Sequence, residues 1–426
     1  MTDKIHRAIE AVWRIESPRL IAGLVRLVGD VGTAEDLAQD ALLVALEKWP
    51  ETGVPDNPGA WLMATAKHRG IDALRRTTRL EKKHQELGIE IEIGHHINAR
   101  DIDAELDDDI GDDLLRLVFM SCHPVLSTEA RAALTLRLLG GLTTDEIARA
   151  FLTPVVTISQ RIVRAKKTLN EAGVKFEVPR GAKLGERLSS VLEVIYLIFN
   201  EGYSATAGDD WMRPQLCDDA LRLGRVVAEL MPQESEVHGL VALMEIQASR
   251  ARARVSATGE PILLFDQNRA RWDHTLIQRG LAALARAERL GDLGKYGMQA
   301  AIAACHARAG ANEATDWTRI AELYDVLAAR SPSPVVELNR AVAHAMAFGP
   351  AVGLEMVDAL MSEPSLKMYH WLPSVRGDFL VKLGRLEEAR GEFERAAGMT
   401  KNLREREMLV ARAETCAREM QFRPGN

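Results

Sequence analysis

Residues 141–167, GLTTDEIARAFLTPVVTISQRIVRAKK, constrain the fold most, because their capping signals and apolar spacing predict two short helices joined by a tight turn. Thr143 and Glu146 have the spacing of a capping box, in which a hydroxyl and a carboxylate each satisfy an unpaired backbone donor. Thr153 and Pro154 then offer a second N-cap followed by a proline at the first helical position. The segment is therefore predicted to form a helix-turn-helix.

The second of these helices is predicted to bury an apolar stripe formed by Ile158, Ile162, Ala165 and Leu169. This spacing turns a polar face outward. Gln and Arg can each make two hydrogen bonds to a base edge in the major groove, whereas Lys neutralises phosphate. Four basic residues and no acidic residue lie between Pro154 and Lys167, which favours DNA binding over a merely solvated face. The predicted outward residues are Thr157, Gln160, Arg161, Arg164 and Lys167.

The net charge of −7 is unusual for a DNA-binding chain, but it is unevenly distributed. Residues 77–113 hold twelve acidic and four basic side chains, whereas residues 114–177 hold five acidic and nine basic ones. The global charge therefore conceals a local basic site. The acidic stretch at 81–113 is predicted to be a linker between a domain at 1–80 and a domain at 114–177.

Length and composition indicate a globular chain, since 426 residues with a hydrophobic fraction of 47% can form several packed domains. No secretory leader or membrane span is evident, so a cytoplasmic location without membrane contact is expected. The four cysteines are far apart and form no CxxC motif, which predicts buried thiols and indicates neither a metal site nor a disulfide framework. No cofactor is indicated. These cysteines are Cys122, Cys217, Cys305 and Cys416.

The segment GDVGTAEDLAQDALLVALEKWP predicts an amphipathic helix with Leu37, Ala41, Ala45 and Trp49 on its buried face. The opposite face is an acidic stripe interrupted by a leucine, as expected of a surface that docks on basic helices of a partner. The alternative is that one aspartate completes an N-terminal cap with Thr33 while the other acids are only solvated. The stripe consists of Asp36, Gln39, Asp40, Leu43 and Glu47, of which the aspartates are expected to be exposed.

Next, the loop PETGVPDNPGA leads into WLMATAKHRGIDALRR, a second candidate nucleic-acid surface. A Pro/Asn/Gly loop can pocket an unstacked base while a neighbouring basic helix follows the phosphates of a single strand. A surface helix with a basic last turn is the alternative interpretation. Apolar residues able to pack are Trp61, Leu62, Ala66, Ile71 and Leu74, and the polar or basic ones are Lys67, His68, Arg69, Arg75 and Arg76.

The order of these parts resembles the extracytoplasmic-function sigma factors of bacterial RNA polymerase. The resemblance covers residues 1 to about 177 and rests on three motifs: AEDLAQDAL, W-L-x(3)-A-x(5)-D-x(2)-R-R, and T-P-x(2)-T-[VI]-x(2)-R-[IL]-x-R-A-[RK]. It implies a sigma-2 domain that binds the clamp helices of the polymerase and melts the minus-ten element. It also implies a sigma-4 domain that reads the minus-thirty-five element.

This resemblance assigns roles to the candidate residues. Asp36, Gln39 and Asp40, with Leu43 and Glu47 on the same stripe, are implied to bind polymerase. Two departures from the family pattern, Ala66-Lys67-His68 where an asparagine is usual and Ser159 where a basic residue is common, prevent the transfer of base preferences. The implied DNA-binding residues are Asn57, Trp61, Lys67, His68, Arg69, Arg75 and Arg76 at the melted strand, and Thr157, Ser159, Gln160, Arg161, Arg164 and Lys167 at the upstream element.

Residues 178–426 are almost entirely helical in pattern. AMAFGPAVGLEMVDAL and LVKLGRLEEARGEFERAA align with Gly349 on Gly384, a period of 35 close to that of tetratricopeptide repeats. The arrangement resembles the sigma-factor subgroup with a C-terminal tetratricopeptide-like extension, which is expected to regulate and to hold a protein or peptide partner on its repeat face. YLIFNEGYSAT and LFDQNRARWDH are interpreted as polar packing between helices, because no nucleophile and base or phosphate loop accompanies them.

The sequence thus predicts an all-α protein with a sigma-2 domain, a linker, a sigma-4 domain and a helical repeat domain. Its expected function is that of an alternative sigma factor, not an enzyme, with core RNA polymerase and promoter DNA as partners. The competing interpretation is a repeat-based scaffold or sensor that acts as an ordinary DNA-binding regulator, independent of core polymerase. The acidic stripe and the loop with its basic helix favour the sigma factor, because an ordinary regulator needs neither.

Overall fold

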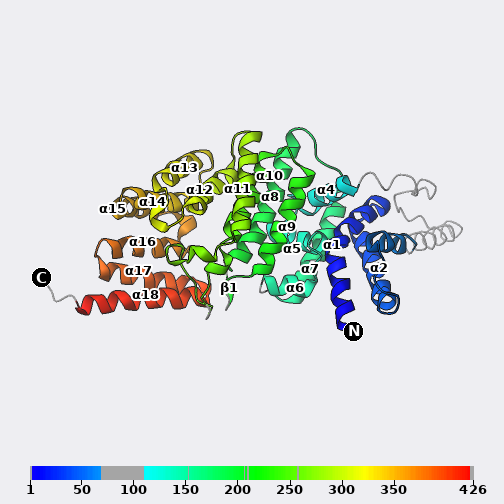
Figure 1. The fold of residues 1–426 in the computed structure, drawn as a ribbon, viewed down its shortest axis with the longest axis horizontal. Coiled ribbons are helices and arrows are strands. Elements are labelled where there is room, and N and C mark those ends of the chain that lie inside the picture. The colour runs from blue at the N-terminus through cyan, green and yellow to red at the C-terminus, as the bar shows by residue number, and fades with distance from the viewer. Residues whose placement is uncertain are drawn as a thin grey trace. The chain divides into compact units, whose positions relative to one another are not determined.

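The computed structural model describes residues 2–68, 110–151, 153–205, 207–208, 211–256 and 259–422, and it forms two compact units dominated by helices (Figure 1). The first unit covers Met1–Ile195 and the second Tyr196–Asn426. The predicted all-α class is confirmed, and one short pair of strands is the only sheet within these described ranges. None of the described helices has an apolar run long enough to cross a lipid bilayer.

The first unit is built from helices on both sides of residues 69–109, which are outside the described ranges. The linker predicted at 81–113 falls mostly in that gap, and its last residues, 110–113, begin a helix. The helices of this unit are α1 (Thr2–Val28), α2 (Val31–Thr52), a helix at 58–68, α4 (Ile110–Ser121), α5 (Thr128–Leu138), α6 (Thr144–Ala150), α7 (Val155–Glu171) and the first part of α8 (Ala182–Tyr203).

Helix α2 packs on α1 through the apolar stripe that its sequence predicts. Leu37, Ala41, Ala45 and Trp49 are all buried, which confirms the amphipathic pattern. The alternative interpretation, a cap formed by Thr33 with Asp36, is wrong, because the helix begins earlier. Asp30 is the N-cap, and its Oδ1 accepts hydrogen bonds from the backbone nitrogen of Thr33 at 2.7 Å and from the Thr33 hydroxyl at 2.8 Å.

The helix-turn-helix is formed by α6 and α7. Its predicted capping box is confirmed, since the Thr143 hydroxyl accepts from the Glu146 backbone nitrogen and the Glu146 carboxylate accepts from that of Thr143. The predicted second N-cap is wrong: Pro154 itself occupies the cap of α7, and the Thr153 hydroxyl donates to the carbonyl of Phe151. The apolar stripe of the second helix is buried as predicted, at Ile158, Ile162, Ala165 and Leu169.

The second unit is a succession of helices with short 3-10 turns between some of them. Its helices are the end of α8, α9 (Pro214–Leu230), α10 (Ser235–Ala248), α11 (His274–Leu290), α12 (Lys295–Arg308), α13 (Trp317–Arg330), α14 (Pro334–Phe348), α15 (Pro350–Leu360), α16 (Trp371–Lys382), α17 (Leu386–Met399) and α18 (Leu403–Phe422). The 3-10 turns are η1 (Ala251–Ala253), η2 (Leu264–Asp266), η3 (Arg269–Arg271), η4 (Asn312–Ala314) and η5 (Pro364–Leu366).

The 35-residue match between Gly349 and Gly384 corresponds to a repeated turn. Gly349 separates α14 from α15 with a φ of +109°, and Gly384 separates α16 from α17 with a φ of +77°. Glycine adopts these left-handed conformations without the steric penalty of a Cβ atom, so both turns depend on it. The helices after each glycine share one core, in which Leu354 and Phe393 are buried. The 35-residue period thus corresponds to two pairs of helices, each joined at a glycine.

Two contacts in the second unit join segments far apart in the chain. Strand β1 (Ala207–Gly208) pairs in parallel with β2 (Lys401–Asn402), and the buried Asn402 side chain donates to the carbonyl of Ala205 at 3.2 Å. The polar packing predicted for LFDQNRARWDH is confirmed at Arg269, which donates to the carbonyls of His306 and Ala309. Three cysteines are buried as predicted, whereas Cys305 is only half-buried.

Candidate functional site

The outward face of α7 has the predicted polar character. Gln160 and Arg164 are exposed, and Arg161 is half-buried. Lys167 keeps 72% of its side chain exposed and lies 3.5 Å from the equally solvated carboxylate of Glu171. A hollow of about 360 Å³ lies along this face, beside the start of α5. It is lined by Val125, Leu126, Ser127, Ala130, Thr157, Gln160, Arg161, Arg164, Ala165 and Thr168.

Two valines on the same helix were not predicted as functional residues. Val156 is 67% exposed and Val163 is 61% exposed, and their spacing places them on the face that carries Gln160 and Lys167. Apolar side chains in a major groove can contact the methyl group of thymine. The signal was present in the sequence, because both valines lie off the buried stripe. Thr157 and Ser159 are exposed on this helix as well.

The helix at 58–68 begins with a side-chain cap. The exposed Asn57 accepts a hydrogen bond from the backbone nitrogen of Ala60 at 3.0 Å, so its side chain has a structural partner. Trp61 is half-buried, and its ring meets that of Trp49 edge-on at a centroid distance of 5.2 Å. Lys67 is half-buried and His68 is exposed. Arg69, Arg75 and Arg76 lie outside the described residues, as do the packing candidates Ile71 and Leu74.

On α2 the acidic stripe is less uniformly exposed than its sequence suggested. Asp36, Leu43 and Glu47 are exposed, with 56% of Leu43 accessible to solvent. Asp40 is half-buried rather than exposed. Gln39 is also half-buried and donates to the carboxylate of Glu35 at 2.6 Å. The solvent-facing part of the stripe therefore consists of two acids flanking a leucine.

Glu35 is a buried carboxylate that the sequence reasoning missed. It comes from α2, is only 3% exposed, and meets two cations from the helix-turn-helix part of the unit. Arg137 of α5 donates through Nε to Oε1 at 2.6 Å, and the ammonium of Lys166 on α7 forms an ion pair with Oε2. Burial alone raises the pKa of Glu35, but the charges of Arg137 and Lys166 outweigh it and bring this pKa below its ordinary value.

Two further ion pairs connect α1 with the helices that follow the 69–109 gap. Arg14 donates to the capping-box carboxylate of Glu146 at 2.6 Å. Arg26 Nε lies 3.2 Å from the buried carboxylate of Asp113 on α4. Together with Glu35, these pairs hold α1 and α2 against α4–α7. A sequence signal existed for Glu35 alone, because it stands between buried Ala34 and Ala38 on an amphipathic helix, where a charge requires a partner.

The first part of α8 belongs to the same unit as the helix-turn-helix. Arg131 of α5 donates to the Ser190 hydroxyl at 2.5 Å and lies 3.2 Å from the carboxylate of Glu193. Ser190 in turn donates to the carbonyl of Cys122 at 2.6 Å, and Arg187 donates to that of Phe119 at 2.6 Å. Residues 182–195 therefore cover α4 and α5.

Three segments of the chain match known protein families. Residues 13–80 match sigma-70 region 2, and residues 116–169 match sigma-70, region 4. Residues 187–288 match a family of unknown function, DUF6596. The first two matches contain α2 and the helix-turn-helix, respectively. The third begins within α8 and covers the first helices of the second unit.

Individual relatives agree with these matches. The uncharacterized protein R00370 of Rhizobium meliloti (strain 1021) is 41% identical over 400 residues, which is 91% of each chain. The probable ECF RNA polymerase sigma factor SigI of Mycobacterium tuberculosis (strain CDC 1551 / Oshkosh) is 26% identical over 174 residues, covering 41% of this chain and 58% of SigI. The probable RNA polymerase sigma-C factor of Mycobacterium bovis (strain ATCC BAA-935 / AF2122/97) is 29% identical over 171 residues, covering 38% of this chain and 82% of that factor.

The matches to regions 2 and 4 occur in the order that the sequence motifs predicted, and the helices that carry them form one unit. The alignments with the two relatives named as sigma factors cover 41% and 38% of this chain, whereas the alignment with R00370 covers 91% and so also includes much of the helical extension. The chain therefore belongs to the extracytoplasmic-function group of the sigma-70 family of RNA polymerase sigma factors.

Proposed function

We propose that this sigma factor reads the minus-thirty-five element with the outward face of α7, docks on core polymerase with the outward face of α2, and is regulated through its C-terminal extension. The observation that carries the proposal is the exposed face of α7, whose polar and basic side chains surround Gln160 and Arg164. The capped helix α6 and the turn after it hold α7 so that this face stays in solvent, an arrangement that a helix with no binding role would not require. No catalytic role is proposed for any residue.

Base reading is assigned to Gln160 and Arg164. Both are exposed on α7, and neither has a carboxylate partner within the described residues. Their side chains can each form two hydrogen bonds with a purine edge. Lys167 is assigned to phosphate, because its flexible ammonium neutralises charge without distinguishing bases. Thr157, Ser159 and Arg161 are proposed to support this surface, and Val156 and Val163 to contact thymine methyl groups.

Polymerase docking is assigned to the exposed part of the acidic stripe. Asp36 and Glu47 flank Leu43, so charge can orient a basic partner helix while the leucine is buried against it. Gln39 and Asp40 are proposed to contribute at the edge of this surface. By family resemblance, Asn57, Trp61, Lys67 and His68, with Arg69, Arg75 and Arg76, are proposed to meet the melted strand.

The ion pairs around Glu35 are proposed to hold a closed arrangement that opens on the promoter. The minus-ten and minus-thirty-five elements lie about 25 base pairs apart, or about 85 Å at 3.4 Å per pair. Helices α2 and α7 are in direct contact through Glu35 and Lys166, so the two parts of the unit must separate to reach both elements. Opening therefore carries a free-energy cost that the polymerase and DNA must offset.

The C-terminal extension is proposed to favour the competent sigma region rather than mask it. In support of this, residues 182–195 of α8 cover α4 and α5 through Arg131, Arg187 and Ser190. A segment that supplies part of the packing of the DNA-binding helices can stabilise them directly. A protein or peptide partner on the repeat face is proposed to act on the sigma region through the chain of α8.

We expect Gln160→Ala and Arg164→Ala each to lower discrimination at particular upstream bases by about 1–3 kcal/mol, because each removes a pair of hydrogen bonds to a base edge. Lys167→Ala is the matched control and should weaken binding almost uniformly across sequences. Polymerase-dependent promoter binding would be measured on templates with single substitutions in the upstream element. A uniform loss in the first two variants, or a base-specific loss in the control, would show that α7 faces the DNA differently.

Glu35→Gln is expected to loosen the closed arrangement by about 1–3 kcal/mol, since it leaves the partly exposed Arg137 and Lys166 without their anion. Hydrogen exchange of α2 and α7 should accelerate, while exposed Glu51→Gln on the same helix should change nothing. Because the folded pKa of Glu35 is depressed, its contribution is present at neutral pH and is lost as pH falls through that folded pKa. Unchanged exchange in Glu35→Gln would contradict the proposed role of this carboxylate.

Truncation after Ile195 should lower promoter-specific transcription relative to the full chain, because it keeps the contacts of Arg131 but ends α8 before its last residue, Tyr203. Truncation after Lys175 should lower it further, since the helix that covers α4 and α5 is then lost. Transcription would be compared at matched protein concentration. Higher activity after truncation would identify the extension as a mask, and equal activity would show that it serves only an outside partner.

A further inference from the structure

Five arginines gather near one bend of the second unit, where η1 and η3 follow α10. They alternate with alanine along two short segments, SRARAR and NRAR. Within the described residues, none of the five forms an ion pair with a carboxylate. These arginines are Arg250, Arg252, Arg254, Arg269 and Arg271.

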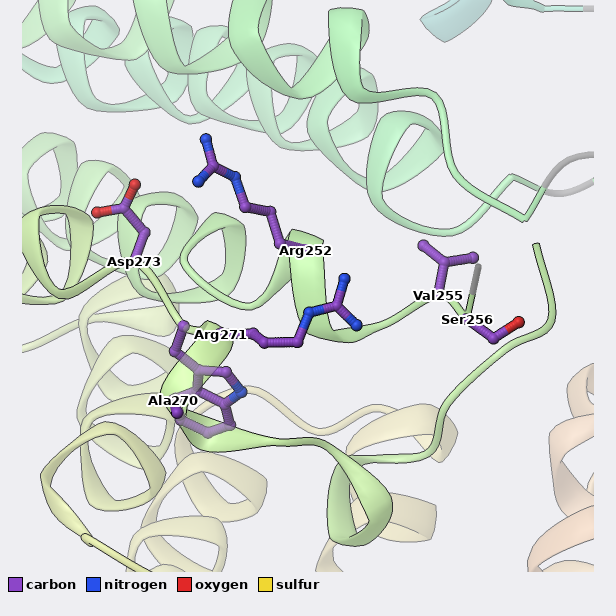
Figure 2. Close-up of a pocket in the computed structure, with 7 residues that line it drawn as sticks. Arg252, Val255, Ser256, Ala270, Arg271 and Asp273 are labelled. Atoms are coloured by element: carbon purple, nitrogen blue, oxygen red, sulfur yellow. The ribbon is translucent and has the colours of Figure 1, made fainter. Parts of the chain in front are cut away.

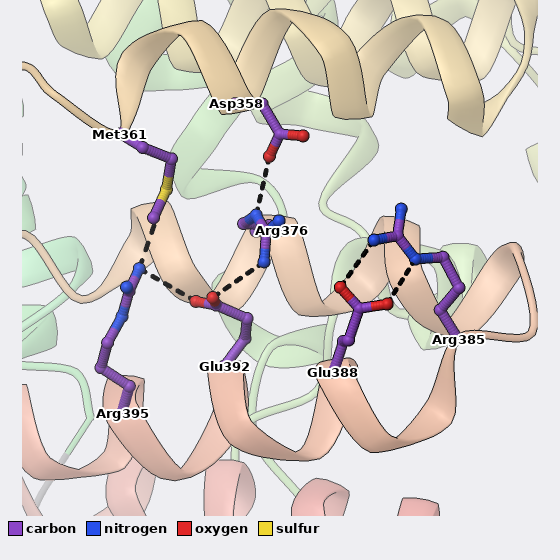
Figure 3. Close-up of polar contacts among 7 residues, drawn as sticks. All are labelled: Asp358, Met361, Arg376, Arg385, Glu388, Glu392 and Arg395. Carbon is purple, nitrogen blue, oxygen red and sulfur yellow. Dashed lines mark hydrogen bonds and ion pairs between the residues drawn. The ribbon is translucent and has the colours of Figure 1, made fainter.

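Several arginines elsewhere in this unit are neutralised by nearby acids. On α16, Arg376 donates to Asp358 at 2.7 Å and to Glu392 at 2.9 Å (Figure 3). Just before α17, Nε and Nη2 of Arg385 donate to the two carboxylate oxygens of Glu388, each at 2.6 Å. The five arginines at the bend differ from these paired arginines, because no carboxylate of the described residues forms an ion pair with them.

Three of these arginines, Arg250, Arg254 and Arg269, lie on the inner side of the bend. They contact aromatic rings, and Arg254 and Arg269 also donate to carbonyl oxygens. The Arg254 guanidinium lies 3.7 Å from the centre of the Tyr203 ring and 4.3 Å from that of Trp211. It donates to the Tyr203 carbonyl at 3.0 Å, but its Nε has no hydrogen-bond partner although the residue is only 9% exposed. Cation–π contacts of this kind orient a guanidinium without cancelling its charge.

The positive charge of these arginines also affects the pKa of a neighbouring histidine, His306. Burial, and then the positive charges of Arg250 and Arg269, lower the pKa of His306 to about 4. Arg269 lies 4.7 Å from the centre of the Trp272 ring, which Arg250 also approaches at 5.9 Å. The interior side of the bend is therefore electropositive, and Trp272, which contacts Arg250 and Arg269, also lines a cavity.

The two outer arginines, Arg252 and Arg271, line that cavity, which has a volume of about 570 Å³. Figure 2 shows that they arrive from separate segments, Arg252 from η1 and Arg271 from η3. Among the described residues of the lining, Asp273 is the one acid. Its Oδ1 caps α11 by accepting from the backbone nitrogens of Thr275 and Leu276. The described residues that line the cavity are Arg252, Val255, Ser256, Ala270, Arg271, Trp272 and Asp273.

We propose that this cavity binds a small organic anion, with phosphate or carboxylate oxygens paired to Arg252 and Arg271. Guanidinium groups match both kinds of oxyanion with two parallel hydrogen bonds. The volume lies within the range of small-molecule sites, and Val255, Ala270 and Trp272 supply an apolar wall. A nucleic-acid backbone is less well matched, because it requires cations along an extended track and this site presents two in a hollow.

The test is calorimetric titration of the full-length chain with pyrophosphate and, separately, with citrate, at constant ionic strength. At least one probe should saturate a single site. The double variant Arg252→Gln, Arg271→Gln should bind that probe about tenfold or more weakly, because charge-assisted hydrogen bonds are lost. Both arginines are exposed, so this variant should keep its fold.

Arg289→Gln removes an exposed positive charge outside the cavity and should leave binding unchanged. Arg252→Lys with Arg271→Lys should bind with intermediate affinity.

The two probes distinguish the ligand classes: saturation by pyrophosphate alone indicates a phosphate ligand, and saturation by citrate alone a carboxylate. The proposal is overturned if neither probe saturates, or if the Arg252→Gln, Arg271→Gln variant binds as tightly as the unaltered chain. It is equally overturned if that variant keeps its affinity for both probes but loses affinity for duplex DNA, which would make the arginines a nucleic-acid contact. None of these readouts depends on transcription.

Discussion

A buried carboxylate on α2 determines how the first unit is assembled. Glu35 has little access to water and is compensated by Arg137 and Lys166, which come from helices more than 100 residues later. Removing such a charge from water is favourable only when close, oriented cations replace the lost solvation. The pairing therefore fixes α2 against α5 and α7. It also links the proposed polymerase-docking helix to the proposed DNA-reading helix through one side chain.

The arrangement of the candidate surfaces follows from that link. The outward sides of α2 and α7 stay exposed while Glu35 and Lys166 meet on their inner sides. In the proposed opening, a partner recognises either surface before the ion pair breaks, and the free energy of partner binding offsets the cost of breaking it. The C-terminal extension enters this same unit through residues 182–195 of α8, so the packing of α4 and α5 is the place where the extension can influence the sigma region.

Local signals predicted much of this structure. The capping box at Thr143 and the buried stripe that includes Ile162 were readable, because caps and helical periodicity depend on residues close in sequence. Contacts between distant segments were not readable in the same way. The strand pair formed by Asn402 and the ion pair of Arg26 with Asp113 depend on tertiary proximity alone. The cap of α2 was misplaced because Asp30 and Thr33 are both residue types that cap helices, and the sequence alone did not distinguish them.

The central claim, that one unit both docks on polymerase and reads promoter DNA, is tested most directly by transcription with purified core polymerase on a promoter library. The unaltered chain should direct initiation at specific promoters while binding DNA only weakly by itself. Asp36→Lys with Glu47→Lys should abolish this initiation without unfolding the chain, whereas Glu288→Lys with Glu414→Lys, an equal charge change in the second unit, should not. Tight sequence-specific DNA binding by the isolated chain, with no effect on core polymerase, would contradict the account and favour an ordinary regulator.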